Sequence, residues 1–347
     1  MKIQSTKSSY SGSNRLVDDS ANKKTIASII EPSDLKKEFR NIFNELIGKY
    51  LEKTLVYRYN SVTKNHSYTP YRHDLNRNTE IVLAEYMRKY IYFYAYSEKE
   101  VIIAYKNKRL EDLELASQRA LRERLPNRQG STNGLYSELL FDLFINLFYE
   151  SNKLATRTIY RQKDDNQEIK GFDGVHFILE EGKKEIWLGQ AKMGSVSYCT
   201  RDILNDLNNK ANIIYSSKQL YFIADKEKSV FEPAMELLNS INNISWKLEG
   251  LSEEERANQL EEYFIKENIK ILCPCLLAYQ SDLYESEGEL ENRINSELEY
   301  MISKFDNEFK TLFRSEYEVL IWIFPIRDLN AIRDNMLNNY GTNNPVH

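Results

Sequence analysis

The sequence contains little of what several large protein classes require. Its 347 residues include only 3 cysteines, 4 histidines, 12 glycines and 7 prolines. The scattered cysteines and histidines lack the spacing of a structural zinc site. The odd number of cysteines favours a reducing compartment, so we expect a cytoplasmic protein. The low glycine and proline content disfavours collagen-like, linker-rich and propeller architectures.

Long apolar runs are also missing. No stretch approaches the roughly 18 uninterrupted apolar residues of a membrane helix, which excludes an integral membrane protein. The polar, serine-rich segment 1–22 lacks the apolar centre of a secretory signal, so we expect no export. The hydrophobic fraction of 41% is sufficient for a proper core. The net charge of -5 predicts that the whole chain attracts DNA only weakly.

Composition and periodicity predict four regions. Residues 1–30 look like a flexible arm, and 31–130 form an N-terminal α+β region. This region has predicted helices at 34–53, 79–97 and 109–124, a strand at 54–60 and a loop at 61–78. A break at Arg128–Gly134 precedes a core at 131–226, and 227–347 form a C-terminal α/β extension of that core.

The core region has a regular order of predicted elements. A very apolar helix at 135–150 is followed by strands at 156–162, 172–179 and 185–192, a helix at 199–216 and a strand at 218–224. The extension has helices at 227–239, 252–267, 286–310 and 328–338. Its strands at 269–279 and 317–326 are apolar enough to lie inside a sheet. Pro274 and Pro325 indicate irregularities or sheet edges there.

A carboxylate interrupts the apolar helix. Glu138 stands among leucines and phenylalanines, and Asp142 shares its face because the two are four residues apart. A carboxylate that faces the interior must be paired, hydrogen-bonded or bound to a metal. The alternative is that Glu138 caps the first helical turn.

Two further signals lie on the predicted strands. Asp173 stands between Gly171 and Gly174, which suggests a close approach of backbone or ligand, although a turn aspartate is the alternative. Gln190 and Lys192 alternate along their strand and so share a face. They could equally belong to a strand that runs out into solvent.

The combination of these signals resembles the PD-(D/E)xK nuclease superfamily. The resemblance covers about 135–225 and implies an α/β fold with a restriction-endonuclease-like αβββαβ core. The N-terminal α+β region and the C-terminal α/β region would be extensions of this core. Phosphodiester hydrolysis by a carboxylate-held Mg²⁺ and a lysine suits these residue types.

The amino-acid sequences of these motifs resemble those of the HamA family, the nuclease subunits of the Hachiman anti-phage defence system. The similar segments are Ser-Glu-Leu-Leu at Glu138, Gly-Phe-Asp-Gly-Val-His at Asp173 and Trp-Leu-Gly-Gln-Ala-Lys at Lys192. The resemblance implies that Glu138, Asp173 and Gln190 hold Mg²⁺ or Mn²⁺ and that Lys192 orients or activates the attacking water. It also implies DNA as substrate and the superfamily 2 helicase HamB as partner.

Gln190 departs from the superfamily, which usually has Glu or Asp at that position. An amide oxygen still ligates Mg²⁺, but it brings no charge to hold the cation. Asp142, one helical turn after Glu138, is expected to compensate. His176 is expected to serve packing or hydrogen bonding. Phosphate contacts are expected from Tyr198 and Arg201, and either phosphate contacts or a solvated loop from Lys153, Arg157, Arg161, Lys163 and Lys170.

We therefore expect a Mg²⁺-dependent DNase that works with a helicase. One alternative is a catalytically weak or inactive module that binds DNA or a helicase, because Gln190 lacks charge. The other is a stand-alone restriction-type endonuclease. Residues 1–130 and 250–347 are expected to dock the helicase because neither is needed for the predicted core. The acidic stretches 252–262 and 286–299 are expected to be solvated or partner-facing and to repel DNA.

Overall fold

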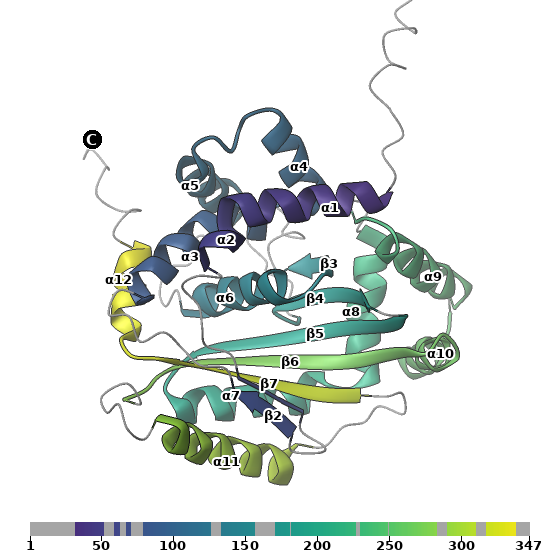
Figure 1. Cartoon of the computed structure of the whole chain (residues 1–347). Helices are drawn as coiled ribbons and strands as arrows, with labels where there is room; N and C mark the ends of the chain where they lie inside the picture. The colour runs from purple at the N-terminus through teal and green to yellow at the C-terminus, as the bar shows by residue number, and fades with distance from the viewer. Residues whose placement is uncertain are drawn as a thin grey trace, which may run out of the picture.

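The computed structural model describes most of the chain. The described residues are 32–51, 59–62, 67–70, 79–125, 133–156, 171–180, 182–226, 230–248, 250–282, 290–309 and 317–337. The arm predicted at 1–30 lies outside them. The fold is mixed α/β, as expected, with one sheet between helices (Figure 1).

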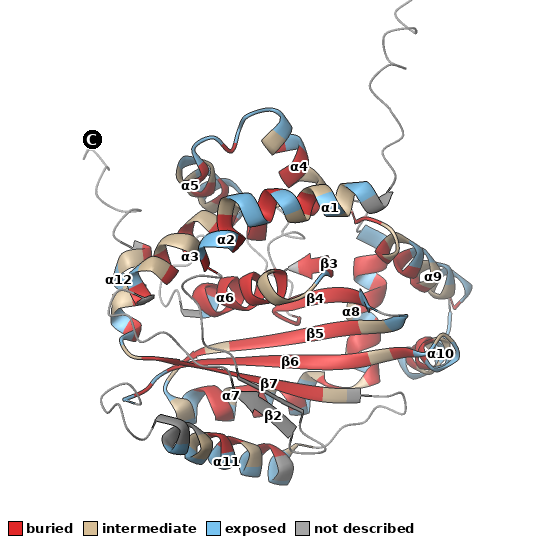
Figure 2. Cartoon of the chain, in the orientation of Figure 1, coloured by how far each residue is buried: buried red, intermediate tan, exposed pale blue. Residues whose placement is uncertain are grey.

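The sheet has seven strands in the order β2-β1-β7-β6-β5-β4-β3. The pairs β3–β4 and β4–β5 are antiparallel, whereas β5–β6 and β6–β7 are parallel. Most of the length of β4 to β7 is buried (Figure 2). The strands are β1 (Tyr59–Val62), β2 (Ser67–Pro70), β3 (Ser151–Thr156), β4 (Gly174–Glu180), β5 (Lys183–Gly194), β6 (Ile269–Gln280) and β7 (Tyr317–Ile326).

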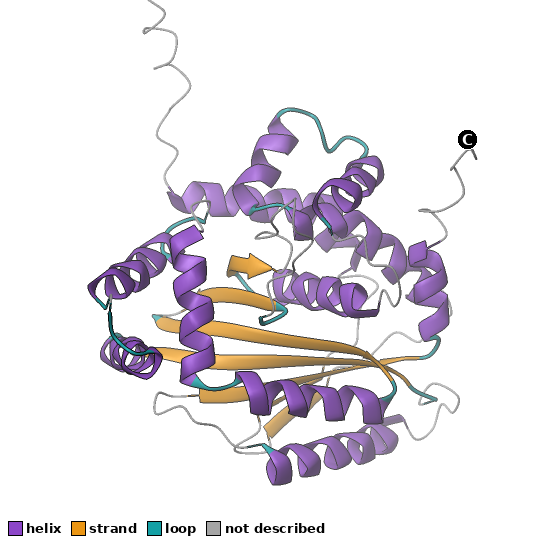
Figure 3. Ribbon diagram, turned by 180° about the vertical axis from the view of Figure 1, so that it is seen from behind, coloured by secondary structure: helices purple, strands orange, loops and turns teal. Residues whose placement is uncertain are grey.

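Helices cover both faces of the sheet. The helix α6 packs on β5 from one side, and α7 packs on β5 and β6 from the other (Figures 1 and 3). The helices are α1 (Pro32–Phe43), which continues through the π-helical η1 (Asn44–Gly48) into α2 (Lys49–Leu51), then α3 (Thr79–Ala95), α4 (Glu98–Lys106), α5 (Leu113–Arg124), α6 (Asn133–Phe148), α7 (Val196–Lys210), α8 (Ile213–Lys226), α9 (Ala234–Lys247), α10 (Glu253–Lys266), α11 (Leu290–Glu308) and α12 (Leu329–Leu337). Among the described residues, no helix is long and apolar enough to cross a membrane.

The strand predicted at 218–224 is wrong, because this segment belongs to α8. Leu220, Ile223 and Ala224 are buried, whereas Phe222 is exposed. This spacing of three and four residues is helical, and the apolar run hid it. The order α6–β3–β4–β5–α7 agrees with the prediction, but the strand that follows these elements in the sheet is β6, after α8, α9 and α10.

Two smaller predictions remain. The strand predicted at 156–162 lies outside the described residues except for Thr156, which ends β3 (Ser151–Thr156). The segment predicted as a loop at 61–78 contains the end of β1 and all of β2, which pair with each other. Pro70 and the many polar residues of this segment made it resemble a loop.

The sheet draws on strands from both ends of the chain. The strand β1 pairs with β7, and β6 lies between β5 and β7. Residues 31–130, 131–226 and 227–347 therefore share one sheet. Pro274 lies in this central part and not at an edge, yet the irregularity expected there exists. The β5–β6 pairing is interrupted between Trp187–Leu272 and Gln190–Cys275.

Candidate active site

The position of α6 is set by a pair of glycines. Gly174 and Gly189 lie opposite each other on β4 and β5. A Cβ atom at Gly189 would be 2.0 Å from the Phe141 ring, and one at Gly174 would be 3.2 Å from it. The absence of side chains thus lets the helix approach the sheet closely. This contact holds Glu138, one turn earlier, against the same strands.

Glu138 is buried, with an exposed fraction of 2%. It is the sixth residue of α6, and no acidic residue stands in the first turn of that helix, so the alternative of a capping glutamate is wrong. Its Oε2 accepts a hydrogen bond of 2.8 Å from the hydroxyl of Tyr94 on α3. A helix of the N-terminal region therefore supports this carboxylate.

Asp173 directly precedes β4 and is fixed to β5 by two hydrogen bonds. Its backbone N–H donates to the carbonyl of Gly189 over 2.9 Å, and its Oδ2 accepts from the N–H of Ala191 over 2.7 Å. The side chain is buried, at 2% exposure. Asp173 is thus more than a turn residue, because its carboxylate is held beside the strand that carries Gln190 and Lys192.

Gln190 is completely buried, and within the described structure neither amide atom has a hydrogen-bond partner. Such a group costs about 1–3 kcal/mol unless a partner satisfies it. Its position inside the protein also contradicts the alternative of a strand that runs into solvent. The amide oxygen could ligate a cation, and either amide atom could form a hydrogen bond with water.

Lys192 is partly buried and bound to a residue that the sequence did not single out. Its Nζ lies 2.6 Å from Asp206 on α7, and Asp206 also pairs with Lys210 over 2.8 Å. Burial lowers the pKa of the Lys192 ammonium, but the carboxylates of Asp173 and Asp206 outweigh this effect, and the pKa is raised. Lys192 is therefore a cation at neutral pH and serves as a hydrogen-bond donor.

Three of the predicted site residues meet at one small pocket. This pocket of about 70 Å³ lies between the start of α6, the end of β5 and the start of α7. Its lining comprises Gly134, Ser137, Glu138, Asp173, Ala191, Lys192, Met193 and Tyr198. Gln190 and Asp142 are not among the lining residues. The fold thus brings together two carboxylates, Glu138 and Asp173, and the lysine Lys192 from three separate segments of the chain.

Asp142 belongs to a different, fully buried cluster. Its carboxylate lies 2.8 Å from Lys153 Nζ and 3.2 Å from His176 Nε2, and it accepts a hydrogen bond of 2.5 Å from Tyr90. Burial raises the pKa of Asp142, but Lys153 and His176 overcome this and lower it to about 2. Because its oxygens face these partners, the expectation that Asp142 compensates for Gln190 loses its support.

The remaining polar residues of the prediction fall into three groups. His176 has the hydrogen-bonding role expected of it, since its Nδ1 lies 3.2 Å from Ser151 Oγ. Lys153 is buried in β3 and donates to the Phe93 carbonyl, which contradicts both alternatives predicted for it, the phosphate contact and the solvated loop. The other four residues of that basic cluster lie outside the described part. Tyr198 lines the pocket and is 40% exposed, and the exposed Arg201 lies 5.8 Å from its ring.

Tyr94 and Asp206 are the contributors that the sequence analysis missed. Tyr94 was one of 24 tyrosines, and its helix was placed in a separate region. Asp206 stands in a predicted helix with no spacing that connects it to Lys192. Only the fold brings these side chains to Glu138 and Lys192, so no local pattern indicated them.

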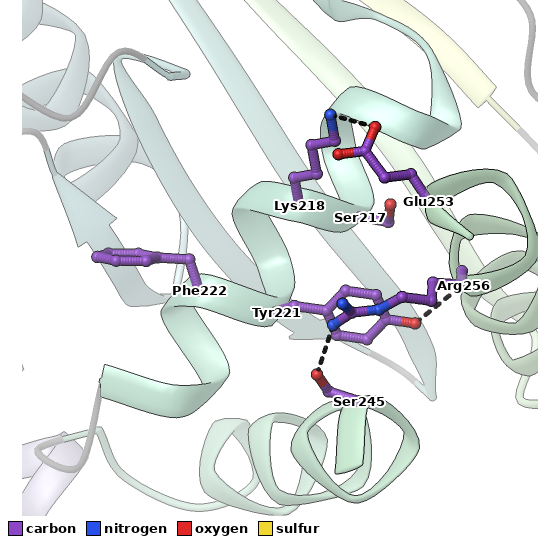
Figure 4. A pocket seen from close by; sticks show the side chains of 7 residues that line it. All are labelled: Ser217, Lys218, Tyr221, Phe222, Ser245, Glu253 and Arg256. Carbon is purple, nitrogen blue, oxygen red and sulfur yellow. Dashed lines mark hydrogen bonds and ion pairs between the residues drawn. The ribbon is translucent and has the colours of Figure 1, made fainter. Parts of the chain in front are cut away.

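A larger pocket of about 320 Å³ lies elsewhere, between α8, α9 and α10 (Figure 4). Arg256 donates to Ser245 over 3.0 Å and lies over the Tyr221 ring, while Lys218 pairs with Glu253 over 2.7 Å. Its two cations are therefore already engaged by neighbouring groups. It contains none of the predicted site residues.

The chemistry of the small pocket fits a hard divalent cation. Mg²⁺ prefers oxygen donors, and Glu138 and Asp173 provide them at the pocket, while the unsatisfied amide of Gln190 lies outside the pocket lining on the same strand as Lys192. Within the described residues, no group of three or more His, Cys, Asp or Glu side chains could hold a metal. The pocket thus offers a cation two carboxylates, with water to complete its shell.

Fold and pocket together define a mixed α/β protein with a candidate site of two acids and one lysine. A family model described as HamA matches residues 47–339. The chain therefore belongs to the HamA family, and this membership supports a role as a component of the Hachiman defence system. Comparisons with curated proteins and with solved structures each find no match.

Proposed function

We propose that this chain is the metal-dependent DNase of a Hachiman anti-phage complex and cleaves phosphodiester bonds by hydrolysis. The observation that supports this most strongly is the meeting of Glu138, Asp173 and Lys192 at one pocket. These are the residue types that the PD-(D/E)xK resemblance requires. They come from α6, the start of β4 and the end of β5, which match the expected order.

The proposed roles follow from the contacts. Glu138, Asp173 and Gln190 hold the cation, which when bound lowers the pKa of a water and stabilises charge on the phosphate. Lys192 donates a hydrogen bond to the attacking water or to a phosphate oxygen. Asp206, 2.6 Å from its Nζ, keeps the ammonium charged and in place. The partly exposed Tyr198 contributes to the approach of the DNA backbone.

The proposed partner is the superfamily 2 helicase HamB. The net charge of -5 and the exposed glutamates at the start of α10 oppose strong binding of DNA by the chain alone. A translocating helicase would supply most contacts to DNA. The regions predicted to dock this helicase also contribute to the fold and to the site. The prediction treated 1–130 and 250–347 as unnecessary for the core, whereas α3 supports Glu138 and β6 and β7 lie inside the sheet.

A non-catalytic module is the second candidate. The uncharged Gln190 favours it, because a site with one fewer carboxylate binds divalent cations less tightly. A stand-alone restriction-type endonuclease is the third candidate. It requires the isolated chain to bind and cleave DNA without a helicase.

The experiment compares DNA cleavage by the wild-type chain and by Asp173→Asn and Lys192→Ala, each with and without HamB, in Mg²⁺ and in EDTA. We expect both substitutions to reduce cleavage at least about 100-fold, on the scale of losing an essential acid or base. The matched control is Glu180→Gln, which alters an exposed carboxylate at the far end of β4. It should cleave as the wild type does.

The outcomes separate the candidates. Cleavage that needs both Mg²⁺ and HamB and is lost in the two variants supports the proposal. Full cleavage by the isolated chain at physiological salt favours the stand-alone endonuclease. Absence of cleavage by the wild-type complex, with stable binding of HamB, favours the non-catalytic module. Wild-type cleavage by Asp173→Asn contradicts the site itself.

A further inference from the structure

Two tyrosines of α3 reach two carboxylates of α6. Tyr94 donates to Glu138 over 2.8 Å, and Tyr90 donates to Asp142 over 2.5 Å. The two tyrosines are four residues apart on α3, and the two carboxylates are four residues apart on α6, so each set projects from one face of its helix. The higher number on α3 meets the lower number on α6, which means that the helices run antiparallel at this contact. All four residues are buried.

The two carboxylates have different surroundings. Asp142 is engaged by Lys153 and His176 and is not among the residues that line the pocket. Glu138 lines that pocket together with Asp173 and Lys192. The two tyrosines thus make the same kind of hydrogen bond, but only the one from Tyr94 ends on a carboxylate of the candidate site.

The position of the Tyr94 hydroxyl is well defined. Its ring has an exposed fraction of 0%, and core packing therefore fixes where the oxygen lies. Lys153 Nζ lies 5.8 Å from the centre of this ring. A cation over an aromatic face draws electron density from it, which makes the phenolic O–H a stronger donor.

A fixed donor constrains the acceptor. The Glu138 side chain has three rotatable bonds, and a hydrogen bond to Oε2 selects one orientation of the carboxylate plane. Groups that hold a ligating carboxylate in this way usually matter for metal affinity, because an unheld ligand loses conformational entropy on binding. Tyr94 thus meets the geometric requirement for preparing Glu138 before a cation arrives.

We propose that Tyr94 is a positioning residue that orients Glu138 for a divalent cation in the pocket. This inference rests on the proposed function. It assigns α3, from the predicted N-terminal region, a part in building the metal site. Tyr90, one turn earlier, serves the Asp142 cluster and has no part in cation binding.

The test is calorimetric titration of Mn²⁺ into the purified, metal-free full-length chain. Tyr94→Phe removes one oxygen atom and should raise the Kd at least about tenfold, the usual effect of losing a group that holds a ligand. Tyr90→Phe is the matched control, because it also loses a buried hydrogen bond from α3 to a carboxylate of α6, together with the bond that Asn146 donates to the Tyr90 hydroxyl. It should leave the Kd within about twofold of the wild type. Thermal melts of both variants check the fold, and Tyr94→Met replaces Tyr94→Phe if the latter melts early.

A double-mutant cycle identifies the route of the effect. If Tyr94 acts through Glu138, then Tyr94→Phe changes the Kd in the wild-type background and not in Glu138→Gln. An unchanged Kd in Tyr94→Phe, with weakened binding in Glu138→Gln, overturns the inference and leaves the proposed function intact. Unchanged binding in Glu138→Gln refutes the proposed metal site, and the role of Tyr94 falls with it.

Discussion

The ring of Phe141 occupies the space that a side chain at Gly189 would need, since a Cβ there would lie 2.0 Å from the ring. Gly189→Ala must therefore push α6 away from β5. We expect a loss of about 1–3 kcal/mol in the free energy of unfolding, the usual cost of overpacking. Urea denaturation measures it, and Phe141→Leu should restore part of the loss. An equal loss in both backgrounds would show that the contact is not responsible.

Asp142→Asn should destabilise the protein without weakening metal binding. The change leaves Lys153 as a buried cation beside a neutral amide, which costs about 3–5 kcal/mol. Denaturation at pH 7 measures this cost, and a double variant with Lys153→Met should recover part of it. In the folded variant, calorimetry should give the wild-type Kd for Mn²⁺. Weaker Mn²⁺ binding by Asp142→Asn than by the wild type would mean that Asp142 is a metal ligand after all.

His176 should make stability depend on pH. Burial lowers its pKa below the ordinary 6.5, and Lys153 adds to this effect, while the facing Asp142 carboxylate opposes it. The folded state therefore binds fewer protons than the unfolded state below pH 6.5, and stability present above that pH is lost as the pH falls. The expected loss between pH 7.5 and 5.5 is up to about 1.4 kcal/mol.

The comparison variant for this effect is His176→Gln, which keeps a polar group near Ser151 and Asp142. Denaturation at the two pH values should show a smaller loss for the variant than for the wild type. Equal losses would mean that His176 is already protonated in the folded protein at pH 7.5, or that another group dominates this range.

Gln190 gives opposite predictions for stability and for metal binding. Gln190→Met removes the buried amide without hydrogen bonds, so the metal-free protein in EDTA should be equally stable or about 1 kcal/mol more stable. The same variant should bind Mn²⁺ more weakly, whereas Gln190→Glu should bind it more tightly. Melting curves and calorimetry separate the two effects. Equal Mn²⁺ affinity in all three proteins would remove residue 190 from the ligand set.

The sequence predicted the elements whose patterns are local. The apolar run around Phe141 predicted a helix at 135–150, which the structure confirms as α6. Gln190 and Lys192 were correctly placed on one strand. The HamA resemblance in three short segments agrees with the match over 47–339.

The failures concern contacts between distant segments. Helix and strand were confused at 218–224, because a short apolar run fits both periods. The partners of Asp142, which are Tyr90, Lys153 and His176, lie 52, 11 and 34 positions away, and no spacing rule joins them. The mutual placement of α3 and α6 likewise depends on tertiary packing, so the contact between Tyr94 and Glu138 could not be predicted from the sequence.

The parallel pairing of β5 with β6 has a consequence for folding during synthesis on the ribosome. Gln190 on β5 pairs with Cys275 on β6, which is synthesised much later. The strand β1 pairs with β7 through Leu320, Ile321 and Trp322, which are synthesised later still. A chain made from its N-terminus thus carries Glu138, Asp173 and Lys192 long before the strands that brace them have been synthesised. The sheet edge of β5 stays open during that interval. A nascent chain would therefore lack a finished candidate site, and the hydrolysis proposed for that site could begin only after the last strands of the sheet had been made.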